Sequence, residues 1–209
     1  MDSTHIIERL IPGVNRRFGE GSAALRQHLL RYRFATAYVR EGDRVLDAGC
    51  GSGYGAYILA QAGAQVVGVD RSEEAIAYAR TTYRHDNITW IRSHLHDYQP
   101  PARSFDRIVC FELIEHVERP NALILSLFDM LKEAGVMICS VPVIPTRHFD
   151  CYHRHDFDAH SFAAIFVSSG FVILDRLVQE DTYLTLVVSK SRNPDLEPMP
   201  IDVLGDRSS

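Results

Sequence analysis

The stretch Val45-Leu-Asp-Ala-Gly-Cys-Gly-Ser-Gly-Tyr-Gly55 decides the fold of this 209-residue chain. It begins as an apolar strand that carries Asp47 and continues as a loop in which every second residue is glycine. Glycine has no Cβ and tolerates positive φ, so the backbone of such a loop can approach a ligand closely. The helix expected at Tyr54–Gln61 then opens with N–H groups that face the same ligand. The stretch therefore predicts a strand, a ligand-binding loop and a helix.

A second strand, expected at Gln65–Asp70, ends in a carboxylate 21 positions after Gly49 (70 − 49). A carboxylate at this place can accept hydrogen bonds from two ribose hydroxyls, so the unit is expected to bind a nucleoside. The rival is a dinucleotide site, because Gly51–Ala56 satisfies the pattern G-x-G-x-x-A. Asp47 argues against that rival, since it would bring a negative charge toward a pyrophosphate. It suits a cationic ligand, such as a sulfonium amino acid, far better.

From Arg44 onward, apolar runs of strand length alternate with segments of helical periodicity, which is typical of a parallel sheet with crossover helices. The first strands are expected at Arg44–Ala48, Gln65–Asp70, Ile88–Arg92, Asp106–Phe111 and Val136–Pro142. Helices are expected at Tyr54–Gln61, Glu73–Tyr83 and Asn121–Lys132, with a later one that begins near Asp158 and stops at Gly170. Two antiparallel strands, Phe171–Val178 and Thr182–Lys190, are expected to close one edge of the sheet.

Length and composition favour a single domain, because 209 residues with 46% hydrophobic content can bury one sizeable core. We expect an N-terminal helical cap at 1–41, a ligand-binding domain at 42–190 and a flexible tail at 191–209. In the cap, Arg31, Tyr32 and Arg33 could clamp an acidic substrate or cover the ligand. We favour the simpler interpretation, an amphipathic helix on the sheet edge whose arginines lie in water.

The net charge of −5 argues against a general affinity for nucleic acid or for an anionic membrane, since phosphate binding requires a basic surface. No apolar run reaches membrane-spanning length, and the N-terminus lacks the pattern of a signal peptide. The four cysteines show no metal-binding spacing and are interpreted as reduced, mostly buried thiols. We therefore expect a cytoplasmic protein, a monomer or homodimer, that acts on a small molecule.

The ordered motifs between residues 44 and 190 resemble those of class I S-adenosylmethionine-dependent methyltransferases, in particular the ubiquinone-type O-methyltransferases that act on small molecules. The resemblance rests on the glycine-rich stretch, on Val66–Asp70, and on the segments Ser104–Phe111, Leu131–Gly135, Cys139–Pro142 and Ser169–Phe171. It implies an α/β, Rossmann-like fold in three layers, with a seven-stranded, mostly parallel sheet and an antiparallel C-terminal strand. It also implies S-adenosyl-L-methionine as cosubstrate. Between Glu8 and Ala60 the chain is similar to bacterial methyltransferases of glycan and natural-product pathways.

The same resemblance implies the roles of the cofactor-binding residues. Gly49 and Gly51 would line the methionine portion, and Asp70 the ribose. His94 and Leu95 would line the adenine, although many relatives carry Asp at the position of His94; here Asp97 or the backbone would replace it. The backbone near Phe111 would meet the amino group. The full predicted set is Asp47, Gly49, Cys50, Gly51, Gly53, Asp70, Arg71, His94, Leu95 and Phe111.

A second constellation follows the strand that ends at Phe111. Glu112, Glu115 and His116 are expected at the carboxyl edge of the sheet, where open α/β sheets place their chemistry. Four more imidazoles follow at His148, His153, His155 and His160. We expect His116 or His153 to act as the general base and Glu115 to orient an imidazole.

Two other interpretations of this constellation stay open. Glu112, Glu115, His116 and either His153 or His155 could bind a divalent metal, since E-x-x-E-H resembles ubiquinone-type and small-RNA 2′-O-methyltransferases in which such groups do so. This metal site is the less favoured reading. Alternatively, Glu115 and His116 only cap a turn, and the later histidines form a solvated loop.

The leading hypothesis is thus methyl transfer to a small molecule, at a hydroxyl oxygen of a sugar, a phenol or a natural-product intermediate. An RNA 2′-O-methyltransferase with a Glu/His metal site is the alternative within the same class, and the acidic charge argues against it. A non-catalytic, cofactor-binding partner subunit and a nicotinamide oxidoreductase are the alternatives from other classes. An absorbance or fluorescence change on mixing with NADH would indicate the oxidoreductase, and failure to methylate any acceptor in a broad screen would favour the binding subunit.

Overall fold

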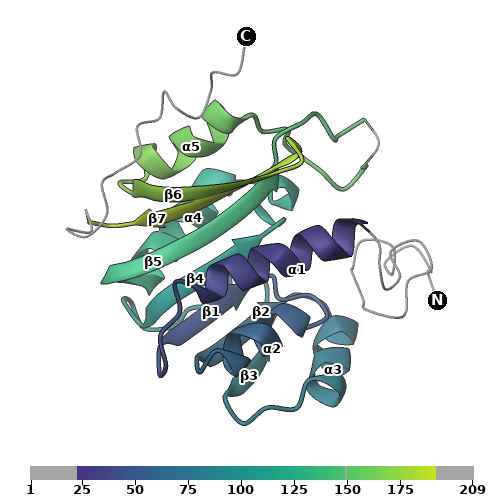
Figure 1. The fold of residues 1–209 in the computed structure, drawn as a ribbon, viewed down its shortest axis with the longest axis vertical. Helices are drawn as coiled ribbons and strands as arrows, with labels where there is room; N and C mark the ends of the chain where they lie inside the picture. Colours follow the sequence, from purple (N-terminus) through teal and green to yellow (C-terminus); the bar gives the residue numbers. More distant parts are fainter. Residues whose placement is uncertain (1–22, 149, 192–209) are drawn as a thin grey trace. The chain divides into compact units, whose positions relative to one another are not determined.

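The computed structural model describes residues 23–148 and 150–191 (Figure 1). The chain forms two compact units, with the boundary in the sequence between Asp97 and Tyr98. The tail expected at 191–209 lies outside the described residues except for Ser191, as do the first 22 residues of the expected cap. The domain boundaries expected at residues 41 and 190 stay predictions.

The first unit alternates helices and strands. Its elements are α1 (Ala23–Thr36), β1 (Arg44–Ala48), α2 (Tyr54–Gln61), β2 (Gln65–Asp70), α3 (Glu73–Thr82) and β3 (Ile88–Arg92). β2 pairs in parallel with β1 on one side and with β3 on the other, so that Asp47 lies beside Gly68 and Gly68 beside Trp90. Four of the five residues of β1 are buried. This near-continuous burial is what a parallel strand covered on both faces requires.

The second unit contains the remaining four strands. Its elements are β4 (Phe105–Phe111), the short 3₁₀ helix η2 (Ile114–His116), α4 (Pro120–Met130), β5 (Leu131–Pro142), α5 (Ala159–Ser168), β6 (Val172–Gln179) and β7 (Tyr183–Ser189). β4 and β5 are parallel, whereas β7 runs antiparallel to both β5 and β6. In sheet order the strands are β3-β2-β1 in the first unit and β4-β5-β7-β6 in the second, seven strands among the residues that the structure describes. The predicted mostly parallel sheet with an antiparallel C-terminal strand is confirmed.

The start of β5 differs from the prediction, which extended a helix to Lys132 and began the strand at Val136. In the structure, α4 ends at Met130 and Leu131 already pairs with Phe105, while Val136 pairs with Arg107. The residues between these two pairs form an irregularity in the ladder. Apolar residues continue at helical spacing through Leu131, so periodicity could not separate the last helical residue from the first strand residue.

Side-chain caps set two helix starts. Ser72 accepts a hydrogen bond from the backbone N–H of Ala75 at the start of α3. At the start of α5, the Asp158 carboxylate accepts from the Ser161 N–H at 2.7 Å, and the Asp158 N–H donates to the Ser161 hydroxyl at 3.0 Å. This reciprocal capping box confirms the helix start predicted at Asp158. Gly170 follows α5 with φ of 90°, as its predicted role as the stop requires.

All four cysteines of the chain lie within the described residues. Cys50, Cys110 and Cys139 are buried free thiols, and Cys151 is exposed. The prediction that most of the thiols are buried is confirmed. Across residues 23–148 and 150–191, none of the helices combines the length and the apolar character needed to cross a membrane.

Candidate functional site

The glycine-rich loop of the first unit has a backbone that only glycine adopts readily. Gly49, Gly51 and Gly53 have φ of 77°, 52° and 93°. The N–H groups of Gly49 and Cys50 both donate to the carbonyl of Val69, at 2.8 and 3.0 Å, which holds the loop against the end of β2. A Cβ on Gly53 would lie 2.7 Å from the Trp90 ring, so this glycine also permits close packing.

Asp70 connects the loop to the start of α3. One carboxylate oxygen accepts a hydrogen bond from the Gly51 N–H at 2.9 Å, and the other accepts from the Ser72 N–H at 2.8 Å. The side chain is only partly buried. Each carboxylate oxygen has a second lone pair, so Asp70 can still accept two hydroxyl donors.

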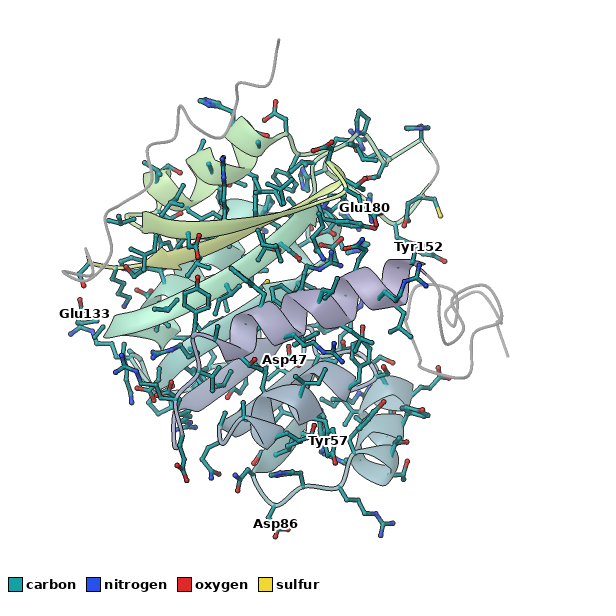
Figure 2. The ribbon with its side chains drawn as sticks, viewed as in Figure 1. Asp47, Tyr57, Asp86, Glu133, Tyr152 and Glu180 are labelled. Carbon is teal, nitrogen blue, oxygen red and sulfur yellow. The ribbon has the colours of Figure 1, made fainter. Side chains whose placement is uncertain are left out.

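Asp47 is completely buried beneath α1, where Figure 2 labels it. Burial raises the pKa of its carboxyl to about 7, and the negative charge of Asp70 raises it further, while hydrogen bonds from Tyr32 and Ala56 oppose the rise. The Tyr32 hydroxyl donates to Oδ1 at 2.9 Å. Within the part of the chain that the structure describes, Oδ2 accepts no hydrogen bond. A buried carboxyl with such a pKa is a frequent feature of ligand sites.

An aromatic cluster from α1 and α2 lies next to this carboxylate. The rings of His28, Tyr32 and Tyr54 have centroids 5.4 to 5.8 Å apart. Tyr32 packs so closely on Gly55 that a Cβ there would lie 1.9 Å from Cζ of the ring. Burial lowers the pKa of His28 well below its ordinary value, and the charge of Arg31 lowers it further. The start of α2 is thus enclosed by side chains of α1.

Arg31 corrects the prediction that the arginines of the N-terminal helix lie in water. Only 2% of Arg31 is exposed, whereas Arg33 is exposed as predicted. The buried residues of α1 are Leu25, Arg31, Tyr32 and Ala35, which a helical repeat places on one side. The long polar side chain lies on the packed face, and no residue type in the sequence marks that.

The other predicted cofactor-binding residues differ in their surroundings. Cys50 is buried, and the Phe111 side chain is buried at the last position of β4. Arg71 and His94 are exposed, and Leu95 is partly buried. His94 stacks on His96 with centroids 5.2 Å apart, and His96 in turn lies 3.2 Å from Asp97. The Trp90 ring packs against Gly53 and Gly68, and its place beside the loop was not predicted. A sequence signal for it is Gly68, since a glycine within a strand indicates a close approach by another group.

In the second unit, the ligand atoms of Glu115, His116 and His153 lie within 4.8 Å of one another. The rings of the two histidines meet edge to face, with centroids 4.6 Å apart. The loop after β5 is held to η2 by the Glu115 carbonyl, which accepts from the N–H groups of Arg154 and His155 at 2.8 and 3.2 Å. The structure thus brings together the three predicted catalytic residues, from segments almost forty positions apart.

Hydrogen bonds distinguish the two imidazoles. Nδ1 of His116 lies 3.2 Å from the carbonyl oxygen of Tyr152, which is labelled in Figure 2. A carbonyl only accepts, so Nδ1 carries the proton and the lone pair of neutral His116 is on Nε2. In His153, Nδ1 is bonded to the Thr146 hydroxyl and Nε2 lies 3.4 Å from Asp150. Burial, together with the charge of His116, lowers the pKa of His153, against the opposing charges of Asp150 and Asp156.

The remaining members of the predicted constellation have other contacts. Glu112 accepts a hydrogen bond from the Ser140 hydroxyl at 2.7 Å, and Nε2 of His155 lies 3.0 Å from the carbonyl of Val117. Neither joins the three clustered ligand atoms. His148, in the loop after β5, and His160, in α5, are both exposed.

Several known proteins that are similar to this chain are named methyltransferases. Residues 18–175 match a family model described as a methyltransferase domain. A protein of Mycolicibacterium smegmatis named probable S-adenosylmethionine-dependent methyltransferase is 30% identical over 176 residues, which cover 81% of this chain and 66% of that protein. A ubiquinone biosynthesis O-methyltransferase of Idiomarina loihiensis is 37% identical over 103 residues, which cover 47% of this chain and 42% of that protein.

Solved structures share the fold at low sequence identity. A protein from Pyrococcus horikoshii matches 81% of this chain with a TM-score of 0.69 at 20% identity, and the match includes 92% of that structure. An S-adenosylmethionine dependent methyltransferase from Mesorhizobium loti matches 76% of this chain with a TM-score of 0.66 at 19% identity, and 97% of that structure is covered. The chain spans 48 to 66% of the length of its mycobacterial relatives.

Proposed function

Because this chain belongs to the methyltransferase domain family of class I S-adenosylmethionine-dependent enzymes, we propose that it transfers a methyl group from S-adenosyl-L-methionine to a hydroxyl oxygen of a small molecule. The observation that carries the proposal is the pair of carboxylates at the glycine-rich loop. Asp47 and Asp70 lie close enough for the charge of one to raise the pKa of the other. Two neighbouring carboxylates disfavour a pyrophosphate and favour a cationic nucleoside.

Each carboxylate has its own task in this proposal. The oxygens of Asp70 accept hydrogen bonds from the ribose hydroxyls, for which each has a spare lone pair. Asp47 supplies negative charge toward the sulfonium and ammonium groups. The cosubstrate contributes a methyl group already activated by the positive sulfur, so the protein has to supply orientation and exclusion of water.

His116 is the general base of the proposal. A hydroxyl becomes a better nucleophile when its proton is removed as the new bond forms. Nε2 of His116 has the lone pair for this step, because the Tyr152 carbonyl holds the proton on Nδ1. Glu115, buried beside it, stabilises the imidazolium that results. His153 has both ring nitrogens occupied, so we place it in a supporting role.

The acceptor is a small molecule with a hydroxyl group, such as a sugar, a phenol or a natural-product intermediate. Support comes from the similarity to proteins named ubiquinone biosynthesis O-methyltransferases, several of which match about half of this chain. The formal charge of −5 also suits a small acceptor better than a polyanion.

A metal-dependent 2′-O-methyltransferase acting on RNA is the second candidate, and the Glu115, His116 and His153 cluster is the observation in its favour. Glu115 and Nε2 of His116 are suitable ligands for a divalent cation. His153 fits poorly, since Thr146 and Asp150 occupy its two nitrogens. Glu112 and His155 are also engaged elsewhere. We therefore derive no step through a metal.

The test is a titration of the protein with S-adenosylmethionine, S-adenosylhomocysteine and NADH, before and after treatment with a chelator. We expect both adenosyl compounds to bind and NADH not to bind. A panel of hydroxyl-bearing acceptors is then assayed for release of S-adenosylhomocysteine. Binding of NADH alone would remove the methyltransferase proposal. Activity that appears only with RNA and added Mg²⁺ or Mn²⁺ would favour the second candidate.

A further inference from the structure

Asp150, in the loop after β5, uses its two carboxylate oxygens for two different partners. Oδ1 accepts a hydrogen bond from the Tyr152 N–H at 3.0 Å, and Oδ2 lies 3.4 Å from Nε2 of His153. The Asp150 side chain is 36% exposed, so the carboxylate lies only partly in water. The chemistry proposed above gives this residue no task of its own.

The backbone of Asp150 is fixed as well. Its N–H donates to the Thr146 carbonyl at 2.9 Å, and its carbonyl accepts from the His153 N–H at 3.2 Å. Nδ1 of His153 is bonded to the Thr146 hydroxyl. Asp150 is therefore held at both its backbone N–H and its carbonyl, which limits the directions in which its carboxylate can point.

Both partners of this carboxylate contact His116, the proposed general base. The Tyr152 carbonyl lies 3.2 Å from Nδ1 of His116. The His153 ring meets the His116 ring edge to face, with centroids 4.6 Å apart. Tyr152 is thus held at its N–H by Asp150 and holds His116 with its carbonyl.

These two contacts determine what His116 can do as a base. A neutral imidazole carries one proton, and the Tyr152 carbonyl keeps that proton on Nδ1, so the lone pair is on Nε2. Without this carbonyl the two tautomers would mix, and part of the protein would present an N–H where a base is needed. The edge contact with His153 restricts the plane of the ring. A base needs both, because it must meet the hydroxyl proton at hydrogen-bond distance.

We propose that Asp150 is the positioning residue of the general base: it holds the Tyr152 backbone and the His153 ring, and through them it sets the tautomer and the orientation of His116. This inference rests on the proposed function. In other enzymes a single carboxylate bonds the catalytic imidazole directly and does the same task. Here the carboxylate acts through two intermediate groups, and it touches neither the acceptor nor the cosubstrate.

The first test determines the tautomer of His116 by NMR and needs no acceptor. Protein with ¹⁵N-labelled histidine is measured at about pH 8.5, where an ordinary imidazole is neutral. The His116 signals are assigned by their loss in His116→Gln. We expect the wild-type proton on Nδ1. Asp150→Ala should give a mixture of both tautomers, whereas Asp150→Asn should keep the wild-type form, because its amide oxygen still accepts from the Tyr152 N–H.

Asp158→Ala is the matched control, since Asp158 also accepts from a backbone N–H, that of Ser161 at the start of α5. It should unfold at a lower urea concentration than wild type and leave the His116 tautomer unchanged. If Asp150→Ala does not unfold cooperatively, Asp150→Gly replaces it, because glycine also lacks the carboxylate and suits a turn.

The second test uses an acceptor that the wild-type protein methylates. Asp150→Ala should lower kcat about tenfold or more, while the Kd of S-adenosylmethionine changes less than about twofold. Asp150→Asn should restore most of kcat. In a His116→Gln background, Asp150→Ala should lower kcat no further, because a residue that acts only through His116 has no effect once that imidazole is gone.

The outcomes separate the two levels of the proposal. If wild-type protein binds no S-adenosylmethionine, the proposed function itself fails. If wild-type His116 carries its proton on Nε2, or if Asp150→Ala leaves it entirely on Nδ1, the assignment of Asp150 is overturned and binding of the cosubstrate is unaffected. A further loss of kcat on adding Asp150→Ala to His116→Gln would overturn it as well, since it would show an effect that does not pass through His116.

Discussion

Replacing Asp47 with Asn should stabilise the protein at high pH while weakening its hold on the cosubstrate. Asp47 is completely buried, and its carboxyl has a pKa of about 7 in the folded protein against an ordinary value of 3.8. The Asn side chain has nearly the same shape, and its amide oxygen can still accept the hydrogen bond from the Tyr32 hydroxyl. The substitution therefore removes the charge and leaves the packing.

The size of the effect follows from the two pKa values. Below pH 3.8 the Asp47 carboxyl is protonated in both the folded and the unfolded chain, so it carries no buried charge that could lower the free energy of unfolding. Between pH 3.8 and 7 only the unfolded chain has lost it, so the free energy of unfolding falls as the pH rises. Above pH 7 the cost is constant, and the difference of 3.2 (7 − 3.8) corresponds to about 4 kcal/mol. About half of this cost develops between pH 5.5 and pH 8.5.

Chemical denaturation at pH 5.5 and pH 8.5 measures the effect directly. The stability of Asp47→Asn relative to wild type should increase by about 2 kcal/mol between the two conditions. Titration at pH 8.5 should show S-adenosylmethionine bound about tenfold more weakly by the variant, because the cationic groups lose their partner. A pH dependence of stability identical in the two proteins would refute the reasoning, since it would mean that Asp47 titrates as an ordinary carboxyl.

Asp70→Ala should lower the affinity for S-adenosylmethionine at least about tenfold by calorimetry, through loss of the ribose contacts; unchanged affinity would count against the ribose assignment. Gly55→Ala should destabilise the protein by about 1 to 3 kcal/mol in urea denaturation, because its Cβ would lie 1.9 Å from Cζ of Tyr32; wild-type stability would show that α1 moves aside easily. His116→Gln should lower turnover without changing cosubstrate affinity, while His148→Gln, an exposed control, should do neither; equal turnover in the two variants would remove His116 as the base.

The sequence by itself determined the secondary structure of the first unit and the place of its ligand loop. The bounds of β1, α2, β2 and β3 were predicted as the structure has them. These features depend on neighbours along the chain: apolar runs, glycine where φ must be positive, and Ser or Asp at helix starts. The role expected for Asp70 needed only its place at the end of a strand, and it stays a prediction.

Tertiary structure alone decided which side chains lose their contact with water and which atoms they face. Arg31 and Arg33 look equivalent in the sequence, yet only Arg31 is buried. His116 and His153 were equal candidates for the base until the carbonyl of Tyr152 and the hydroxyl of Thr146 distinguished their nitrogens. Burial and hydrogen-bond partners come from segments distant in the chain, and the energy of a charge depends on them far more than on its sequence neighbours.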